Sequence, residues 1–226
     1  MAEGRDRRLV IVAVFALVAV GIVAAILIGR GGGGSDDETS STTANGCKKE
    51  QPPQPENLDL APPDQTVKPG EKLTAVLETS CGTFDIALDT KDSPKTVNSF
   101  VYLARQGFYD GLEFHRIAPG FVIQGGDPLG NGKGGPGYSV DEPPPGNLAY
   151  TRGVVAMAKT TADPPGRSGS QFFVVTGADA GLSPDYALLG RVSGGLDVVE
   201  KIGRLGTPTQ VPKQTVLIDK VTIEKG

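Results

Sequence analysis

The chain of 226 residues contains no tryptophan, one histidine and two cysteines. With so few ligands, no spacing typical of a zinc site exists, and we expect no metal. We also expect no organic cofactor. A Ser-His-Asp hydrolase would have to use the lone His115 together with a nucleophile elbow. The nearest run, Gly166 to Ser170, lacks the required glycine spacing, so hydrolysis is only a remote alternative.

Positive charge is also scarce, since the formal net charge is −4 and the sequence contains no basic stripe or arginine-rich tract. Nucleic acid is therefore not an expected partner. Three glycines, Gly130, Gly132 and Gly135, match a dinucleotide-binding pattern, but Pro136-Gly137 follows them instead of a helix. No internal repeat indicates a solenoid or a propeller.

The chain has a single long apolar run, Leu9 to Ile28, whose length matches a bilayer core of about 30 Å. Three arginines precede this run and three acidic residues follow it, which places the N-terminus inside the cell. We expect a cytoplasmic segment at 1–8, a single-pass anchor in the cell membrane at 9–28, and the remainder outside. A cleavable signal peptide is the alternative, but no small-x-small site follows the run.

Residues 29–72 are rich in glycine, serine, threonine and acids and then in proline, which predicts a spacer that starts flexible and stiffens. Cys47 and Cys81 lie on the outward side of the expected anchor, where disulfides persist. We expect the two cysteines to pair and to attach the spacer to an early strand, with two unpaired thiols as the alternative.

From Leu73 onward the pattern changes to short strands. Apolar alternation over 73–77 and 84–88 predicts a hairpin, and Val97, Phe100, Val101 and Ala104 predict a helix that starts at Ser93-Pro94 and ends at Gly107. Further strands are expected at 113–115, 122–124, 153–158, 171–176, 187–192 and 216–223, and a second helix at 196–202. Many short strands with two helices favour a mainly β fold, a closed antiparallel barrel.

Two motifs in this region carry a resemblance. Residues 114–127 interleave Arg116 and Gln124 with apolar residues, and residues 168–175 read Ser-Gly-Ser-Gln-Phe-Phe-Val-Val. In this order and spacing they resemble the cyclophilins, and the resemblance covers residues 73–226. It implies a closed eight-stranded cyclophilin-like β-barrel capped by two α-helices, with peptidyl-prolyl cis-trans isomerase activity.

The chemistry of such an enzyme suits an arginine. Amide resonance opposes rotation of a prolyl bond with a barrier of about 18–20 kcal/mol. A donor aimed at the proline nitrogen withdraws its lone pair from resonance, and arginine is a permanently charged donor. We therefore assign Arg116 as catalytic, with Gln124 beside it. Their even separation would place both on one face of a continuous strand, unless Pro119-Gly120 introduces a bulge.

The resemblance also implies a substrate-binding set: His115, Phe121, Val122, Gly132, Ala158, Lys159, Thr160, Gln171, Phe173, Leu182 and Tyr186. Alternation with Arg116 gives His115 a second interpretation, as a packed structural residue. Val122 replaces a methionine of the family, Lys159 an asparagine, Gly181 a tryptophan and Tyr186 a histidine. The missing indole predicts weak binding of cyclosporin-type macrocycles.

The sequence thus predicts a monomeric, membrane-anchored prolyl isomerase that binds proline-containing polypeptide segments and assists the folding of exported or surface proteins. The alternative is a catalytically weak module that only binds peptides, because Lys159 and Gly181 depart from the family pattern.

Overall fold

The computed structural model describes residues 46–226. The expected cytoplasmic segment, the expected anchor at 9–28 and the first part of the spacer lie outside the described residues. Within the described part, no helix has both the length and the apolarity needed to cross a membrane.

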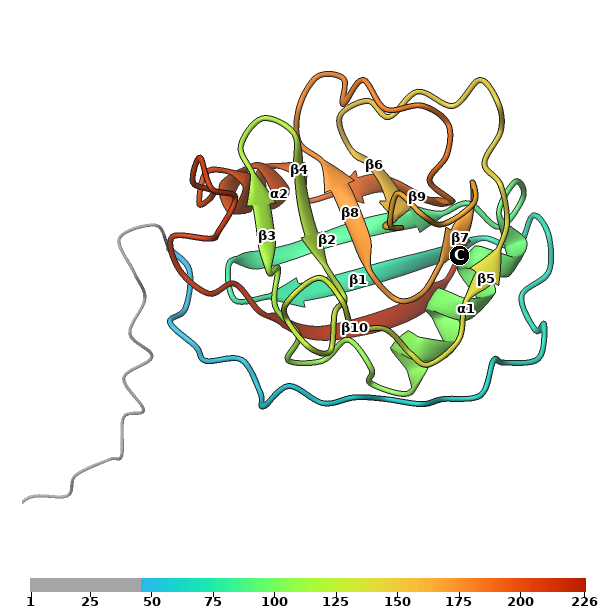
Figure 1. Ribbon diagram of the computed structural model, residues 1–226, viewed down its shortest axis with the longest axis horizontal. Helices are drawn as coiled ribbons and strands as arrows, with labels where there is room; N and C mark the ends of the chain where they lie inside the picture. The colour runs from blue at the N-terminus through green and yellow to red at the C-terminus, as the bar shows by residue number, and fades with distance from the viewer. Residues whose placement is uncertain (1–45) are drawn as a thin grey trace, which may run out of the picture. The chain divides into compact units, whose positions relative to one another are not determined.

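One antiparallel sheet of eight strands forms the body of the domain (Figure 1), in the spatial order β10-β1-β2-β9-β6-β8-β4-β3. Its strands are β1 (Leu73–Thr79), β2 (Gly82–Leu88), β3 (Arg116–Ala118), β4 (Val122–Gly125), β6 (Val154–Met157), β8 (Phe172–Val175), β9 (Leu188–Gly194) and β10 (Ile218–Lys225). A separate two-stranded ribbon, which the sequence did not predict, pairs β5 (Val140–Asp141) with β7 (Arg167–Ser168).

The predicted closed barrel is wrong, because the sheet is open between β3 and β10 and forms a half-barrel. The segment that precedes β3 and the segment that precedes β10 pair at one isolated bridge, between Glu113 and Leu217. Beyond that bridge the Ile117 amide donates over 2.9 Å to the carbonyl of Gln210, which lies in the loop before β10. This loop occupies the edge of β3, so a ladder between β3 and β10 cannot form.

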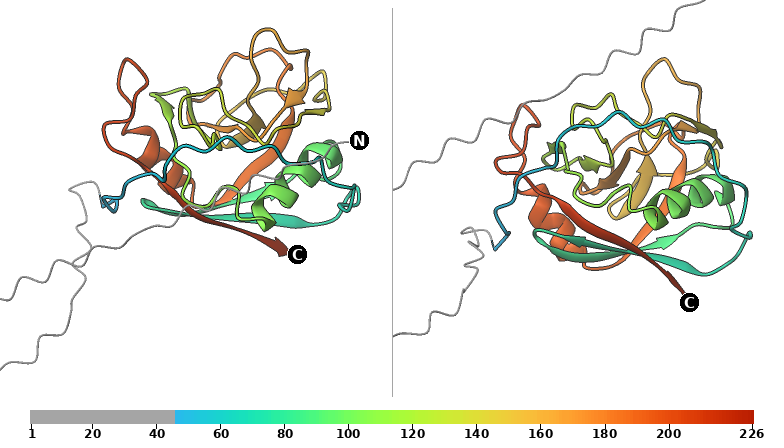
Figure 2. Two further views of the ribbon diagram at one scale, coloured as in Figure 1. Left: turned by 60° about the horizontal axis from the view of Figure 1, so that its bottom comes forward. Right: turned by 90° about the horizontal axis from the view of Figure 1, so that it is seen from below.

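The two helices that the sequence predicted are present, and they lie at opposite ends of the sheet (Figures 1 and 2). The first, α1 (Pro94–Arg105), packs on β10 and β9, and the second, α2 (Leu196–Gly203), packs on β2, β3 and β4. Ser93 holds the N-cap position of α1 but makes no capping hydrogen bond. Glu142 caps the helix instead, because its carboxylate accepts from the amides of Lys95 and Thr96 over 3.1 and 2.7 Å.

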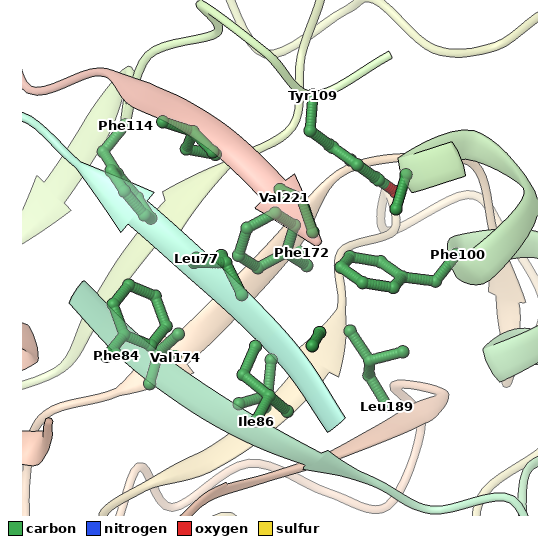
Figure 3. Close-up of a cluster of buried hydrophobic side chains, with 14 of the residues drawn as sticks. Leu77, Phe84, Ile86, Phe100, Tyr109, Phe114, Phe172, Val174, Leu189 and Val221 are labelled. Atoms are coloured by element: carbon green, nitrogen blue, oxygen red, sulfur yellow. The ribbon is translucent and has the colours of Figure 1, made fainter. Parts of the chain in front are cut away.

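The central strands β4, β6 and β8 are buried on both faces. Consecutive residues of β8 alternate, so Phe172 and Val174 join the main core while Phe173 and Val175 join a second apolar layer. The main core contains Phe172 among the rings and aliphatic side chains of β1, β2 and α1 (Figure 3). The second layer lies on the opposite face of the sheet and includes Val122, Tyr150 and Phe173.

The described part of the predicted spacer, residues 46–72, runs along the outside of the domain (Figure 2) and is bonded to it at several points. Val67 is buried, and the Asn98 side chain accepts from the amides of Thr66 and Val67 over 2.8 and 3.0 Å. The expected disulfide between Cys47 and Cys81 is present. This stretch of the chain is therefore attached to the domain along its length.

Candidate functional site

A small pocket of about 150 Å³ opens over the second apolar layer, and we call it the apolar pocket. It is lined by Arg116, Phe121, Val122, Gln124, Ala158, Lys159, Phe173, Leu182 and Tyr186, all of which belong to the predicted site. A larger cavity of about 1040 Å³ lies elsewhere, against β1, β2 and β9. None of the predicted site residues lines that cavity, so the apolar pocket is the candidate site.

Arg116 and Gln124 meet through a hairpin rather than along one strand. The turn at Pro119-Gly120 reverses the chain, and Arg116 on β3 pairs directly with Gln124 on the antiparallel strand β4. Directly paired residues point to the same face of a sheet. The predicted juxtaposition is therefore present, whereas the single continuous strand invoked for it is not.

Hydrogen bonds hold the Arg116 guanidinium on two sides. Its Nη1 donates to Oε1 of Gln124 over 3.0 Å, and its Nε donates to Oε1 of Gln210 over 2.6 Å. Its charge also lies over the Phe121 ring, 5.8 Å from the centroid. Among the described residues no partner is found for Nη2, so this nitrogen can donate to a bound molecule.

The side-chain amides of Gln124 and Gln171 form a chain of hydrogen bonds that starts at Arg116. Arginine can only donate, so Gln124 must present its oxygen to Arg116 and its NH₂ group to the next residue. Gln124 donates over 3.0 Å to Gln171, which donates over 2.9 Å to the carbonyl of Gly134. The orientation of both amides is thereby fixed from the arginine outward.

The apolar wall of the pocket has its own support. Val122 and Phe173 come from the second layer, and the Phe173 ring meets the Tyr186 ring edge to face at 5.5 Å. Tyr150, which is fully buried, donates from its hydroxyl to the Tyr186 carbonyl over 2.6 Å and accepts from the Tyr186 amide over 3.0 Å. These two bonds fix the backbone that carries Tyr186.

A second cavity of about 330 Å³, here called the polar groove, adjoins the apolar pocket and shares Gln124, Ala158 and Lys159 with it. Three more predicted residues line this groove: Gly132, Thr160 and Gln171. Its loop is organised by the buried Asp127, whose carboxylate accepts from the amides of Leu129, Asn131 and Gly132. A peptide passing Gln124 would contact both cavities.

Lys159 lies where the two cavities meet. Its Nζ donates to the carbonyls of Thr160 and Asp163 over 3.2 and 3.0 Å, and it is 5.5 Å from the centroid of the Tyr186 ring. These contacts hold the lysine side chain along the rim of the pocket. Ala158 and Lys159 border both cavities, and Thr160 borders the polar groove.

His115 is the one predicted site residue that lines neither cavity. Its neighbour Arg116 faces the pocket, and adjacent side chains on extended chain point in opposite directions. Burial lowers the pKa of His115 below its usual value. The neutral, half-buried ring agrees with the second interpretation of His115, as a packed structural residue.

Sequence reasoning missed Gln210, Tyr150 and Asp127. Gln210 and Tyr150 act from loops whose local sequence has no periodic pattern, and their partners are 94 and 36 residues away. For Asp127 a signal existed, because an acidic residue before the turn-rich run 128–135 is typical of a carboxylate that accepts backbone amides.

The electrostatics of the pocket suit a donor rather than a nucleophile. Burial lowers the pKa of the Arg116 guanidinium, yet arginine remains charged at any ordinary pH. A fixed cation beside an apolar slot can withdraw electrons from a captured amide nitrogen without forming a covalent bond. Fold and site together define a binding pocket for an apolar ring with a directed hydrogen-bond donor at its edge.

Comparison with known proteins agrees with this class. The family model for cyclophilin-type peptidyl-prolyl cis-trans isomerases matches residues 74–223, so the chain belongs to that family and is a peptidyl-prolyl cis-trans isomerase. Peptidyl-prolyl cis-trans isomerase B of Streptomyces anulatus is 39% identical over 174 residues, which are 68% of this chain and 98% of that protein.

Two further relatives extend the comparison. Peptidyl-prolyl cis-trans isomerase-like 1 of Homo sapiens is 39% identical over 153 residues, covering 66% of this chain and 88% of that protein. A crystal structure of a cyclophilin-type isomerase from Cryptosporidium parvum, obtained in the presence of the dipeptide Ala-Pro, gives a TM-score of 0.62 at 28% identity. That match covers 68% of this chain and 99% of the other.

Proposed function

We propose that Arg116 is the catalytic donor and that the proline ring of an X-Pro segment occupies the apolar pocket. The observation that carries this is the guanidinium held at Nε and Nη1, with Nη2 left to donate. As the X-Pro bond twists, the nitrogen lone pair leaves resonance and Nη2 can donate to it. Gln124 fixes the arginine, while Phe173 and Tyr186 hold the ring.

A prolyl exchange assay tests this mechanism on the full-length protein. Arg116→Ala should lower kcat/KM for a short Ala-Pro peptide at least tenfold, about 1.4 kcal/mol of transition-state stabilisation. Arg152→Ala is the matched control, because Arg152 pairs with Glu200 at 3.2 Å and lines neither cavity. Wild-type exchange by the Arg116 variant would refute the mechanism.

We further propose that the enzyme is a single-pass protein of the cell membrane, with its N-terminus inside and its isomerase domain outside, where it assists the folding of exported or surface proteins. The apolar run at 9–28 and the preceding arginines support the anchor. The Cys47–Cys81 disulfide supports an oxidising compartment. In intact spheroplasts, added protease should digest the domain, whereas protection of the domain would contradict this location.

One departure from the family pattern, glycine in place of tryptophan at position 181, bears on the binding of inhibitors. Gly181 provides no indole beside Leu182, so we propose that cyclosporin-type macrocycles bind weakly. A titration of the enzyme with such a macrocycle, followed by loss of exchange, measures this directly. Inhibition at stoichiometric amounts would contradict it.

A further inference from the structure

The loop of residues 204–214, between α2 and β10, contains one backbone conformation that needs an explanation. Gln210 has a φ of 65°, and it is the only residue other than glycine with positive φ in the described part of the chain. Glutamine rarely adopts this left-handed conformation, which favours glycine and asparagine. Such residues persist where the surroundings determine them, and they concentrate at functional sites.

The loop is held by its own hydrogen bonds. The Gln210 amide donates to the Thr207 carbonyl over 2.8 Å, and the Thr207 hydroxyl donates to the Val211 carbonyl over 2.8 Å. At the base of the loop, the Lys213 amide donates to the Leu205 carbonyl over 2.8 Å. The left-handed residue is therefore part of a defined turn.

This turn contacts β3 at two consecutive residues. The Gln210 carbonyl accepts from the Ile117 amide over 2.9 Å, and the Gln210 side chain accepts from Nε of Arg116 over 2.6 Å. The first bond fixes where the loop lies along the strand. The second is charge-assisted, and hydrogen bonds of that kind are about twice as strong as neutral ones.

We propose that Gln210 is a positioning residue for Arg116. The guanidinium group is planar, so bonds to Nε and Nη1 together fix the plane and the direction in which Nη2 points. Gln124 alone would leave the group free to rotate about its bond to Nη1. The left-handed conformation brings the backbone carbonyl and the side-chain amide of one residue to the edge of β3 at the same time.

The inference rests on the proposed role of Arg116, and two substitutions test it in the full-length enzyme. Gln210→Gly and Gln210→Asn both place a residue that tolerates positive φ at this position, so neither should lower the melting temperature. Glycine has no side chain, and asparagine is one methylene too short to reach Nε. Both should lower kcat/KM for the Ala-Pro peptide by about threefold to tenfold, less than the hundredfold that a 1 Å misplacement can cause.

Two further measurements separate positioning from a general structural role. In the wild type, the Nε–H of Arg116 should be protected from solvent exchange in ¹⁵N NMR spectra, and both variants should lose that protection. On an Arg116→Ala background, Gln210→Asn should cause no further loss of kcat/KM, because the two residues act through one group. Val211→Ala is the control, since this exposed side chain lies in the same loop and lines neither cavity.

The outcomes that overturn the inference are distinct. Wild-type kcat/KM in both Gln210 variants would show that Gln124 alone holds the arginine. A fall in kcat/KM together with a lower melting temperature would show a structural role of the loop. If Arg116→Ala itself retains full activity, the proposed mechanism fails first, and this inference fails with it.

Discussion

Replacing Tyr150 by phenylalanine removes one hydroxyl and keeps the ring. In the wild type this hydroxyl bonds both the carbonyl and the amide of Tyr186, while the Tyr150 ring packs on the rings of Phe173 and Tyr186 at 6.2 and 5.9 Å. Without the hydroxyl, two partly buried backbone groups lose their partner. Such groups cost about 1–3 kcal/mol each when no water replaces the bond.

Because the Tyr186 backbone is only partly buried, water will replace some of what is lost. We therefore expect Tyr150→Phe to lower the free energy of unfolding by about 1–2 kcal/mol, which is roughly 2–8 °C in melting temperature for a chain of this size. Burial raises the pKa of Tyr150 to about 12. The hydroxyl thus stays protonated at neutral pH, and its stabilising contribution is lost only as pH rises from about 10 toward 12.

The effect on catalysis follows from the position of Tyr186 on the pocket wall. Tyr186 lies on the side that would hold the proline ring of the substrate, away from the side that would face the proline nitrogen. We expect KM for the Ala-Pro peptide to rise severalfold while kcat changes little, because the Arg116 contacts do not involve Tyr150. Tyr102→Phe on α1 is the matched control. An unchanged KM in a variant that has lost stability would refute the positional argument and leave Tyr150 a core residue only.

Two further predictions concern stability. Changing Cys47 and Cys81 to serine removes a disulfide that spans 34 residues. The free energy of unfolding, measured in urea, should fall by about 3–4 kcal/mol, and kcat/KM should not change. An unchanged midpoint of urea unfolding would contradict this. Burial and the charge of Asp127 raise the pKa of Glu113, so the folded state favours the protonated form. Glu113→Gln should therefore raise the melting temperature at pH 7, and this gain should shrink as pH falls toward 4.5 and vanish below it, whereas a larger gain at pH 4 would oppose the assignment.

The sequence predicted those elements whose burial follows a regular period. Alternation in 73–77 and 84–88 marked β1 and β2, because one face of each strand is in the core. The helical period between Val97 and Ala104 marked α1 for the same reason. Phe172 and Phe173 are consecutive in the sequence, and they belong to different apolar layers. Local periodicity is sufficient wherever burial is one-sided or strictly alternating.

What the sequence could not predict depends on contacts between distant segments. Glu142 caps α1 from 46 residues away, and Gln210 reaches Arg116 from 94 residues away. The proline-rich composition of residues 51–63 predicted the stiffer part of a spacer and indicated no contact with the domain, yet the Leu60 amide donates to the Pro136 carbonyl over 2.8 Å. No local pattern encodes these pairings, since each depends on which surfaces the folded domain presents.

The open edge of the sheet is part of how the site is built. In a closed barrel the outer edge of β3 would be paired with a neighbouring strand, whose residues would all have extended backbones. Here a loop bonds the Ile117 amide instead, and a loop can hold Gln210 in a left-handed conformation, which regular strand geometry does not include. That conformation directs a side-chain oxygen toward Nε of Arg116 from the edge of the sheet. The break between β3 and β10 therefore supplies the second support of the arginine, which a continuous ladder would exclude.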